Sequence, residues 1–163
     1  AQRTHLGRTA GKQGASKNGS RVIKTYQMKD VFDIKKAVKG IISSALSSGS
    51  ISARIFDVRP KTYKGNYIVV AHVSTTNETL QDSVLYVRIH VPNLVMQTEG
   101  VTDNSQPDIA TLEAISKVVT PALDDIQSGD YAIFVEWAPT IENEPDLNEH
   151  YVSIRLNVKI INN

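Results

Sequence analysis

Apolar residues recur at helical spacing in the segment that follows residue 28. Asp30 is typical of a helix N-cap, and Asp33 places a carboxylate in the first turn, where it interacts favourably with the helix dipole. The run Ser47-Ser48-Gly49-Ser50 is typical of a helix end. We therefore predict an amphipathic helix from about Asp30 to Ser47. Its apolar stripe comprises Val31, Ile34, Val38, Ile41 and Ala45, while Lys35, Lys36 and Lys39 lie away from most of that stripe.

Three segments with β-strand character follow, at Ile51 to Arg59, Gly65 to Ser74 and Ser83 to Val91. The third has the clearest alternation, with Leu85, Val87, Ile89 and Val91 on one face and Tyr86, Arg88 and His90 on the other. This period of two is typical of a half-buried antiparallel strand. The polar and aromatic face fits either a subunit interface or ordinary sheet surface.

A long polar stretch from Asn93 to Pro107 leads to a second predicted helix, from Asp108 to Ser128. Asp108 is the expected cap, and Pro121 is expected to kink the helix or split it in two. The expected apolar stripe comprises Ile109, Leu112, Ile115 or Ala114, Val119, Leu123 and Ile126. Strands are then predicted from Tyr131 to Trp137 and from Tyr151 to Ile160. In the last, the apolar face comprises Val152, Ile154, Leu156, Val158 and Ile160.

The predicted order is α-β-β-β-α-β-β. This order favours an α+β fold, a mostly antiparallel sheet of about five strands flanked by two helices. The 163 residues suit one domain, which we place at residues 28–163. Residues 1–27 are rich in Gly, Ser, Thr and Asn and contain little apolar surface, so we expect a flexible arm.

The arm carries positive charge only. It contains no acidic residue, and its basic residues are Arg3, Arg8, Lys12, Lys17, Arg21 and Lys24. Such an arm fits either contact with nucleic-acid phosphates or docking on a neighbouring protein subunit. We favour the protein partner, because Tyr26 is the only aromatic residue of the arm and single-strand binders interleave several.

The second half of the chain is strongly acidic, although the net charge of the whole chain is only +1. From Glu99 to Glu149 there are twelve acidic residues and one basic residue, Lys117. A basic end and an acidic half on one chain predict assembly through complementary patches, with a solvated acidic face as the alternative. The candidate interface or channel residues are Glu99, Asp103, Asp108, Glu142, Glu144, Asp146 and Glu149.

No motif indicates catalysis, a metal site or a cofactor. Cysteine is absent, and the four histidines lack the spacing of a helical zinc motif, although His72 and His90 suit cross-strand neighbours. The acidic residues between Glu142 and Glu149 lack the pattern of a calcium loop, so a solvated hairpin tip is the preferred interpretation. Asp57 and Glu136 lack the Glu-x-Lys partner of a metal-dependent nuclease. We predict a protein that is not an enzyme, with no cofactor and no membrane segment.

The element order resembles that of the tail-terminator or tail-completion proteins of tailed bacteriophages. The resemblance covers about residues 28 to 163 and is carried by segments such as Asp30-Val31-Phe32-Asp33-Ile34-Lys35-Lys36-Ala37-Val38 and Ile109 to Leu123. It implies a small α+β subunit of a homo-oligomeric ring, a hexamer or dodecamer, at the head-tail joint of a virion assembled in the host cytoplasm. The implied partners are other neck, portal or tail proteins, with DNA passing through the ring without sequence reading.

The basic arm departs from the compact pattern of that family. It makes a variant head-tail connector, or neck, ring protein as plausible as a strict terminator. The competing hypothesis is a nucleic-acid-binding module that uses the arm and a basic surface of the folded domain. That surface would comprise Lys35, Lys36, Lys39, Arg59, Lys61 and Lys64.

Overall fold

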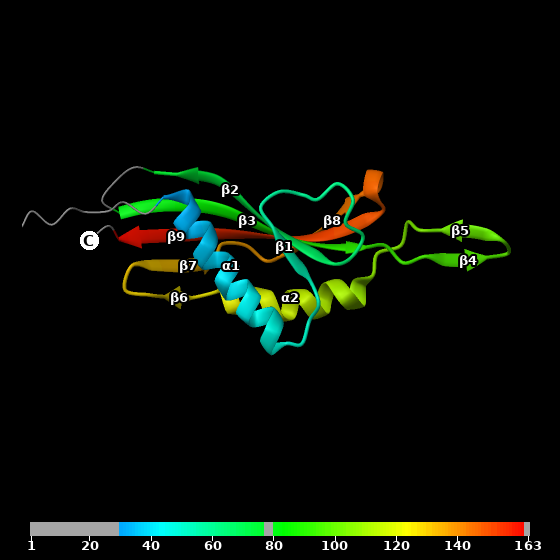
Figure 1. The fold of residues 1–163 in the computed structure, drawn as a ribbon, viewed down its shortest axis with the longest axis horizontal. Helices are drawn as coiled ribbons and strands as arrows, with labels where there is room; N and C mark the ends of the chain where they lie inside the picture. The colour runs from blue at the N-terminus through cyan, green and yellow to red at the C-terminus, as the bar shows by residue number, and fades with distance from the viewer. Residues whose placement is uncertain (1–29, 77–79, 162–163) are drawn as a thin grey trace, which may run out of the picture.

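The computed structural model describes residues 30–76 and 80–161 and has an α+β fold (Figure 1). The helices are α1 (Val31–Ser48), α2 (Ile109–Leu123) and the short 3-10 helix η1 (Pro145–Leu147). The strands are β1 (Arg54–Phe56), β2 (Tyr67–Thr75), β3 (Leu80–Pro92), β4 (Met96–Thr98), β5 (Val101–Asp103), β6 (Ile126–Gln127), β7 (Tyr131–Val135), β8 (Thr140–Glu144) and β9 (Glu149–Ile161). The predicted class is confirmed, with more strands than the five expected.

Seven strands form the main sheet: six follow the order β1-β2-β3-β9-β7-β6, and the seventh, β8, also pairs with β9. All of its pairings are antiparallel except that between β1 and β2, which is parallel. The central pair is β3 with β9, which run side by side from Leu80↔Ile161 to Pro92↔Glu149. On its other side, β9 pairs first with β8 and then with β7, so these two strands follow one another along it.

The first helix is confirmed, with a correction to its buried face. Asp30 caps it by accepting hydrogen bonds from the backbone N–H groups of Phe32 and Asp33, both at 2.9 Å. The buried residues of α1 are Ile34, Val38, Ile42 and Leu46, and Ile41 and Ala45 are only half-buried. The stripe therefore keeps a spacing of four residues, whereas the prediction placed its second half one residue too early.

The second helix begins as predicted and ends earlier. The Asp108 carboxylate accepts hydrogen bonds from the Thr111 backbone N–H at 3.0 Å and from the Thr111 hydroxyl at 2.7 Å. The helix ends at Leu123, two residues after Pro121, so of the two expected effects of Pro121, a kink or a split, the split is wrong, as is the extension to Ser128. Because a proline near the end of a helix removes only one of the last hydrogen bonds, α2 remains one helix. The chain then enters β6.

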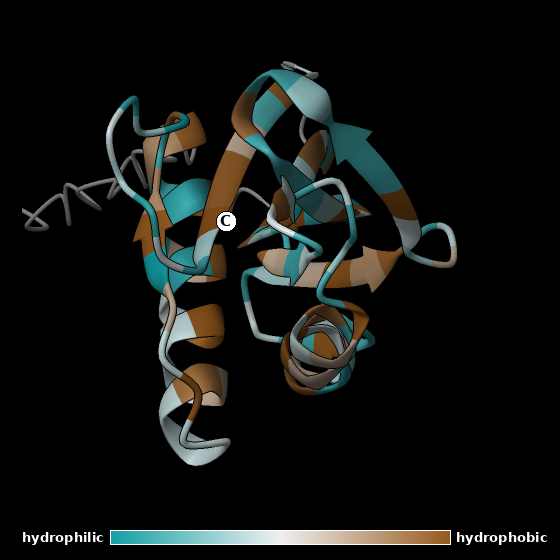
Figure 2. Ribbon diagram, turned by 90° about the vertical axis from the view of Figure 1, so that its right-hand side faces the viewer, coloured by the Kyte–Doolittle hydropathy of each residue, from teal (hydrophilic) through white to brown (hydrophobic). Residues whose placement is uncertain are grey.

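Both helices cover one face of the main sheet. Figure 2 looks along α2 and shows that hydrophobic residues of both helices lie towards the sheet. The apolar faces predicted for the third and last strands are confirmed, because their residues are all buried in one core with those of the helices. The end of α1 approaches α2 closely, since a Cβ on Gly49 would lie 3.0 Å from a methyl carbon of Val118. Among the described residues, no helix combines the length and the apolarity needed to cross a membrane.

Three features depart from the predicted order. The first predicted strand, Ile51 to Arg59, shrinks to the three residues of β1. The stretch expected as a loop contains the hairpin formed by β4 and β5, which projects from one end of the molecule (Figure 1). The strand β8 was not expected. It follows the irregular residues 136–139 and pairs with β9, as β7 does.

Candidate interaction surface

The face of the main sheet that points away from the helices carries polar and aromatic side chains. We call this the outer face, and it comprises Tyr67, Val69, Ala71, Tyr86, Arg88, His90, Tyr151, Ser153 and Arg155. These residues share one face because side chains alternate along a strand and the register aligns Tyr67 with His90 and His90 with Tyr151. Along each strand, these residues alternate with the apolar residues that face the helices.

Three rings stack across the outer face. The Tyr67 and His90 rings are nearly parallel, at 5°, with centroids 4.6 Å apart. The His90 and Tyr151 rings follow at 4.9 Å. This row spans β2, β3 and β9 and buries most of His90, which is 3% exposed. Stacked rings at these distances stabilise cross-strand pairs and hold the surface rigid.

A buried carboxylate, Glu149, lies at one end of this row. The Tyr67 hydroxyl donates a hydrogen bond of 2.7 Å to Glu149 Oε2, and the Arg59 guanidinium lies 3.5 Å from the same oxygen. Arg59 also forms an ion pair with Glu144 at 3.4 Å. Burial, together with the neighbouring carboxylate, raises the pKa of Tyr67 to about 12. Arg59 therefore neutralises two carboxylates, and Glu149 has its charge compensated inside the fold.

His90 is held in its neutral form. Burial, together with the positive charges of Arg59 and Arg88, lowers the pKa of His90 to about 4. Its Nδ1 lies 3.5 Å from Glu149 Oε2, but that atom makes no hydrogen bond. At neutral pH this contact is therefore not an ion pair, and His90 contributes to the outer face as an aromatic ring.

Two arginines lie over aromatic rings further along the outer face. The Arg88 guanidinium carbon is 5.6 Å from the ring centroids of both Tyr86 and Tyr151. Arg155 lies 4.8 Å from the Trp137 ring and forms an ion pair of 2.5 Å with Glu136. Trp137 is 64% exposed. Arginine stacked with aromatic rings is typical of interfaces between proteins.

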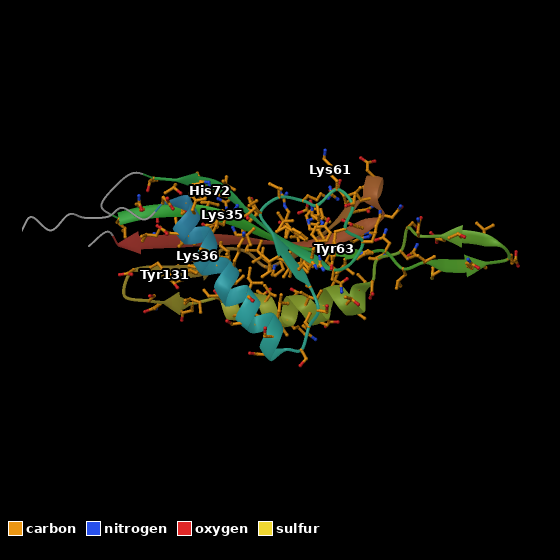
Figure 3. The ribbon with its side chains drawn as sticks, in the orientation of Figure 1. Lys35, Lys36, Lys61, Tyr63, His72 and Tyr131 are labelled. Carbon is orange, nitrogen blue, oxygen red and sulfur yellow. The ribbon has the colours of Figure 1, made fainter. Side chains whose placement is uncertain are left out.

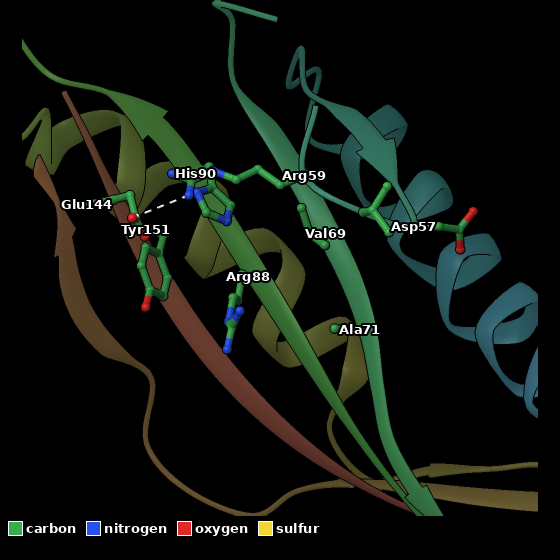
Figure 4. Close-up of a pocket in the computed structure, with 9 residues that line it drawn as sticks. Asp57, Arg59, Val69, Ala71, Arg88, His90, Glu144 and Tyr151 are labelled. Atoms are coloured by element: carbon green, nitrogen blue, oxygen red, sulfur yellow. Dashed lines mark ion pairs between the residues drawn. The ribbon is translucent and has the colours of Figure 1, made fainter. Parts of the chain in front are cut away.

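A cavity of about 260 Å³ opens on the outer face (Figure 4). Its lining combines apolar strand residues with groups of both charges. The residues are Asp57, Val58, Arg59, Val69, Ala71, Arg88, His90, Glu144 and Tyr151. Figure 4 marks the ion pair between Arg59 and Glu144 and shows Arg88 between the strands that carry Ala71 and Tyr151. This chemistry suits recognition of a carboxylate beside apolar groups.

The first acidic segment lies at the projecting hairpin. Glu99 is at the tip, where Glu99 and Gly100 both have positive φ, at 52° and 79°. Asp103 accepts hydrogen bonds from the Ser105 backbone N–H at 2.9 Å and from its hydroxyl at 2.7 Å, and these bonds lower its pKa. Asp108 caps α2. Of the three predicted residues, Glu99 is therefore the one at a projecting tip.

The second acidic segment lies at the same end of the sheet, around β8 and η1 (Figure 1). The two segments are tied together, because the Asn93 backbone N–H donates to the Asn148 carbonyl at 2.9 Å. Glu142 accepts from the Tyr151 hydroxyl at 2.5 Å, and Asp146 is exposed in η1. Glu149 is only 4% exposed, so the interpretation as a solvated tip is wrong for this residue.

The other predicted site residues divide into two groups. The arm residues Arg3, Arg8, Lys12, Lys17, Arg21 and Lys24 lie outside the described residues. In the competing basic surface, Lys35 and Lys39 are both paired with Asp57, at 2.8 Å and 2.5 Å, and the pKa of Asp57 is lowered by these contacts. Figure 3 shows Lys61 pointing from its loop at a distance from Lys35 and Lys36. The six basic residues therefore do not form one unpaired patch.

The predicted histidine pair is wrong. His72 lies opposite Leu85, whereas His90 lies opposite Tyr67. His72 Nε2 instead contacts the Thr75 hydroxyl at 2.7 Å. Within residues 30–76 and 80–161, no three His, Asp or Glu side chains gather as a metal site would require.

Sequence reasoning missed Arg59, Tyr67 and Trp137 as members of this surface. The predicted strands end at Arg59 and Trp137, but in the structure β1 ends at Phe56 and β7 at Val135, so both residues lie outside the strands that were expected to place them. Tyr67 begins β2 and follows the same alternation as Val69 and Ala71, so its side of the sheet was predictable. The recurrence of Tyr or Trp with Arg on one strand face was the available signal.

Comparison with known proteins identifies similar folds only. No family model matches the chain, and no curated protein matches it. One similar solved structure is a chain from the virion of a native gene transfer agent particle, with 13% identity, 78% of this chain and 93% of that chain covered, and a TM-score of 0.51. A second solved structure has 14% identity over 81% of this chain and 96% of its own, with a TM-score of 0.46. The first of these shows that the fold of this chain occurs in a virion particle.

Proposed function

We propose that this chain is a structural subunit of a phage-like virion and that its copies form a closed ring at the head-tail joint. The ring is a neck or tail-terminator ring that surrounds the DNA channel and performs no catalysis. The fold it shares with a chain of a gene transfer agent virion supports this role. The rigid, aromatic outer face supports it as well, because such surfaces are typical of protein interfaces.

The observation that carries the proposal is the separation of charge along the sequence, between the basic residues of the arm and the acidic residues from Glu99 to Glu149. Both acidic segments lie at the end from which the hairpin projects, and α1 begins towards the opposite end (Figure 1). The basic arm joins the fold at the start of α1. A subunit with one basic segment and one acidic segment suits a heterologous interface, in which one face meets a different face of the next copy.

In this account, the arm binds an acidic surface of a neighbouring copy or of another neck, portal or tail protein. The acidic segments line the channel, where they keep DNA from adhering, or dock the next ring of the virion. DNA passes through without sequence reading. Long-range attraction between opposite charges drives binding by the arm, so this binding weakens as the salt concentration rises.

The test is the solution mass of the full chain by light scattering at low and moderate salt. The matched variant replaces the six basic arm residues Arg3, Arg8, Lys12, Lys17, Arg21 and Lys24 with glutamine. We expect the unaltered chain to form a discrete ring-sized oligomer, alone or with neck or tail components. The variant should form this oligomer only at a higher protein concentration. A persistent monomer that shifts to high mass only with added DNA or RNA would instead establish the nucleic-acid-binding alternative.

A further inference from the structure

Among the described residues, 30–76 and 80–161, the projecting hairpin has no partner that covers its apolar side chains. Apolar side chains around β4 and β5 are exposed, Val95 to 71%, Val101 to 68% and Met96 to 42%. A hairpin of two strands is at best marginally stable in water by itself. An apolar projection of this kind marks an interaction site.

The tip of the hairpin carries a carboxylate with a defined position. Glu99 and Gly100 occupy the two central positions of the turn with positive φ, and the turn joins Thr98 to Val101. Two-residue turns with this backbone are compatible with the twist of the flanking strands, so they present their side chains at a fixed place. Glu99 therefore offers a negative charge next to the exposed apolar side chain of Val101.

The outer face offers the complementary charge at Arg88. The other cations there are paired, Arg59 with Glu144, Arg155 with Glu136 and Lys159 with Asp82. Within the described residues, Arg88 has aromatic neighbours and no carboxylate partner, and its buried Nε makes no hydrogen bond. A guanidinium in this position gains most from a carboxylate that arrives from outside, because the site is partly desolvated.

Apolar surface lies next to Arg88. Val69 and Ala71 line the same cavity on β2, and Val58 at its edge is 74% exposed. Figure 4 shows Val69 and Ala71 along the strand beside Arg88. Within the part of the chain that the structure describes, the outer face thus combines the unpaired cation of Arg88 with apolar groups, and the hairpin combines the carboxylate of Glu99 with apolar groups.

We propose that the hairpin of one copy docks on the outer face of the next copy, with Glu99 of the first copy paired to Arg88 of the second. This inference rests on the proposed ring and identifies the contact between neighbouring copies in it. Each copy contributes one hairpin and one outer face, so the contact is heterologous and propagates around a closed ring. Val101 covers the apolar surface at Val58, Val69 and Ala71.

A second copy suits this face better than nucleic acid does. Three carboxylates lie along the outer face and its border, Glu136 against Arg155, Glu142 against Tyr151 and Glu144 against Arg59. They repel a phosphate backbone, whereas a single carboxylate on an apolar hairpin reaches Arg88 and leaves them at the rim.

The first test is a charge exchange between the two residues in the full chain. We expect Arg88→Glu and Glu99→Arg each to raise the protein concentration needed for half-assembly at least tenfold, and the double variant to recover most of that loss. Single variants that assemble like the unaltered chain, or a double variant no better than either single, would overturn the docking contact and leave the ring standing. An unaltered chain that stays monomeric at every concentration, both alone and with neck or tail components, would overturn both proposals.

The second test does not depend on how well the charge variants fold. Because the chain has no cysteine, Thr98→Cys and Ser153→Cys can be placed on separately tagged copies; Ser153 lies opposite Arg88 in the sheet register. After mixing and mild oxidation we expect a cross-linked pair carrying both tags. The matched control pairs Thr98→Cys with Lys117→Cys on α2 and should give at least tenfold less product. The proposal is overturned if the two pairs give equal yields of cross-linked product, or if the pair with Ser153→Cys gives none. It is also overturned if binding of DNA abolishes the product of the pair with Ser153→Cys.

Discussion

The two faces of the main sheet are built from the same strands and differ in what covers them. The face under α1 and α2 is continuous aliphatic core, whereas the outer face carries stacked rings, arginines and a buried carboxylate. Aliphatic packing tolerates little change in volume but does not depend on pH, while a buried polar cluster depends on partners and protonation. The comparison teaches that stability resides mainly on one face and recognition on the other.

Removing core volume from the covered face should have the largest effect. Leu156 is fully buried at the centre of β9, so we expect Leu156→Ala to lower the free energy of unfolding by about 2–5 kcal/mol. The matched control in the same strand is Ser153→Ala on the outer face, which should change the free energy of unfolding by less than about 0.5 kcal/mol. Chemical denaturation measures both. Equal losses would show that the two faces do not differ in this way.

Acid should act on the outer face through His90. Its pKa is about 4 in the fold and near 6.5 when unfolded, so the unfolded chain binds an extra proton between those values. Stability is therefore full above pH 6.5 and falls as the pH drops towards 4, by about 3 kcal/mol from this residue. His90→Phe keeps a ring in the stack without the titration. Between pH 7 and pH 4, the free energy of unfolding of this variant should therefore fall by about 3 kcal/mol less than that of the unaltered chain.

The buried carboxylate provides a narrower test of the outer face. Tyr67→Phe keeps the ring that stacks on His90 and removes the hydroxyl that donates to Glu149. We expect a loss of about 1–3 kcal/mol, because a buried acceptor loses its shortest hydrogen bond. Tyr151→Phe is the control, since its hydroxyl donates to the exposed Glu142 and should contribute less. A larger loss at Tyr151 would contradict the burial argument.

Trp137 is exposed and lies against Arg155, so its removal should affect stability less than the changes at Leu156, His90 and Tyr67 do. We expect Trp137→Ala to cost about 0.5–1 kcal/mol in unfolding, the worth of an exposed cation–π contact. If the outer face is an interface, the same change should weaken assembly by much more than it weakens the fold. Light scattering over a concentration series separates the two effects.

Much of this fold was predictable wherever a pattern ran long enough. The alternation in β3 and β9 identified both faces of the central strands, and Asp30 and Asp108 identified the starts of the helices. The short strands β1, β4, β5, β6 and β8 contain too few residues for a period to be visible. Their pairing depends on neighbours distant in sequence, as Thr140 opposite Ser153 illustrates.

The candidate site was predicted less completely, for a related reason. The sequence indicated the polar face of Tyr86, Arg88 and His90, because alternation assigns a side of the sheet. It did not indicate that Glu149 is buried against Tyr67, since that contact joins the beginnings of two strands 82 residues apart. Charge counting treated Glu149 as one more surface acid, and only the register of the sheet distinguishes it from Asp146.

The most direct test of the central claim is electron microscopy of the purified full chain under the conditions that favour assembly. The account predicts closed rings of uniform diameter with a central channel, and the loss of those rings for Arg88→Glu. Open filaments, irregular aggregates or isolated monomers in the unaltered chain would contradict it.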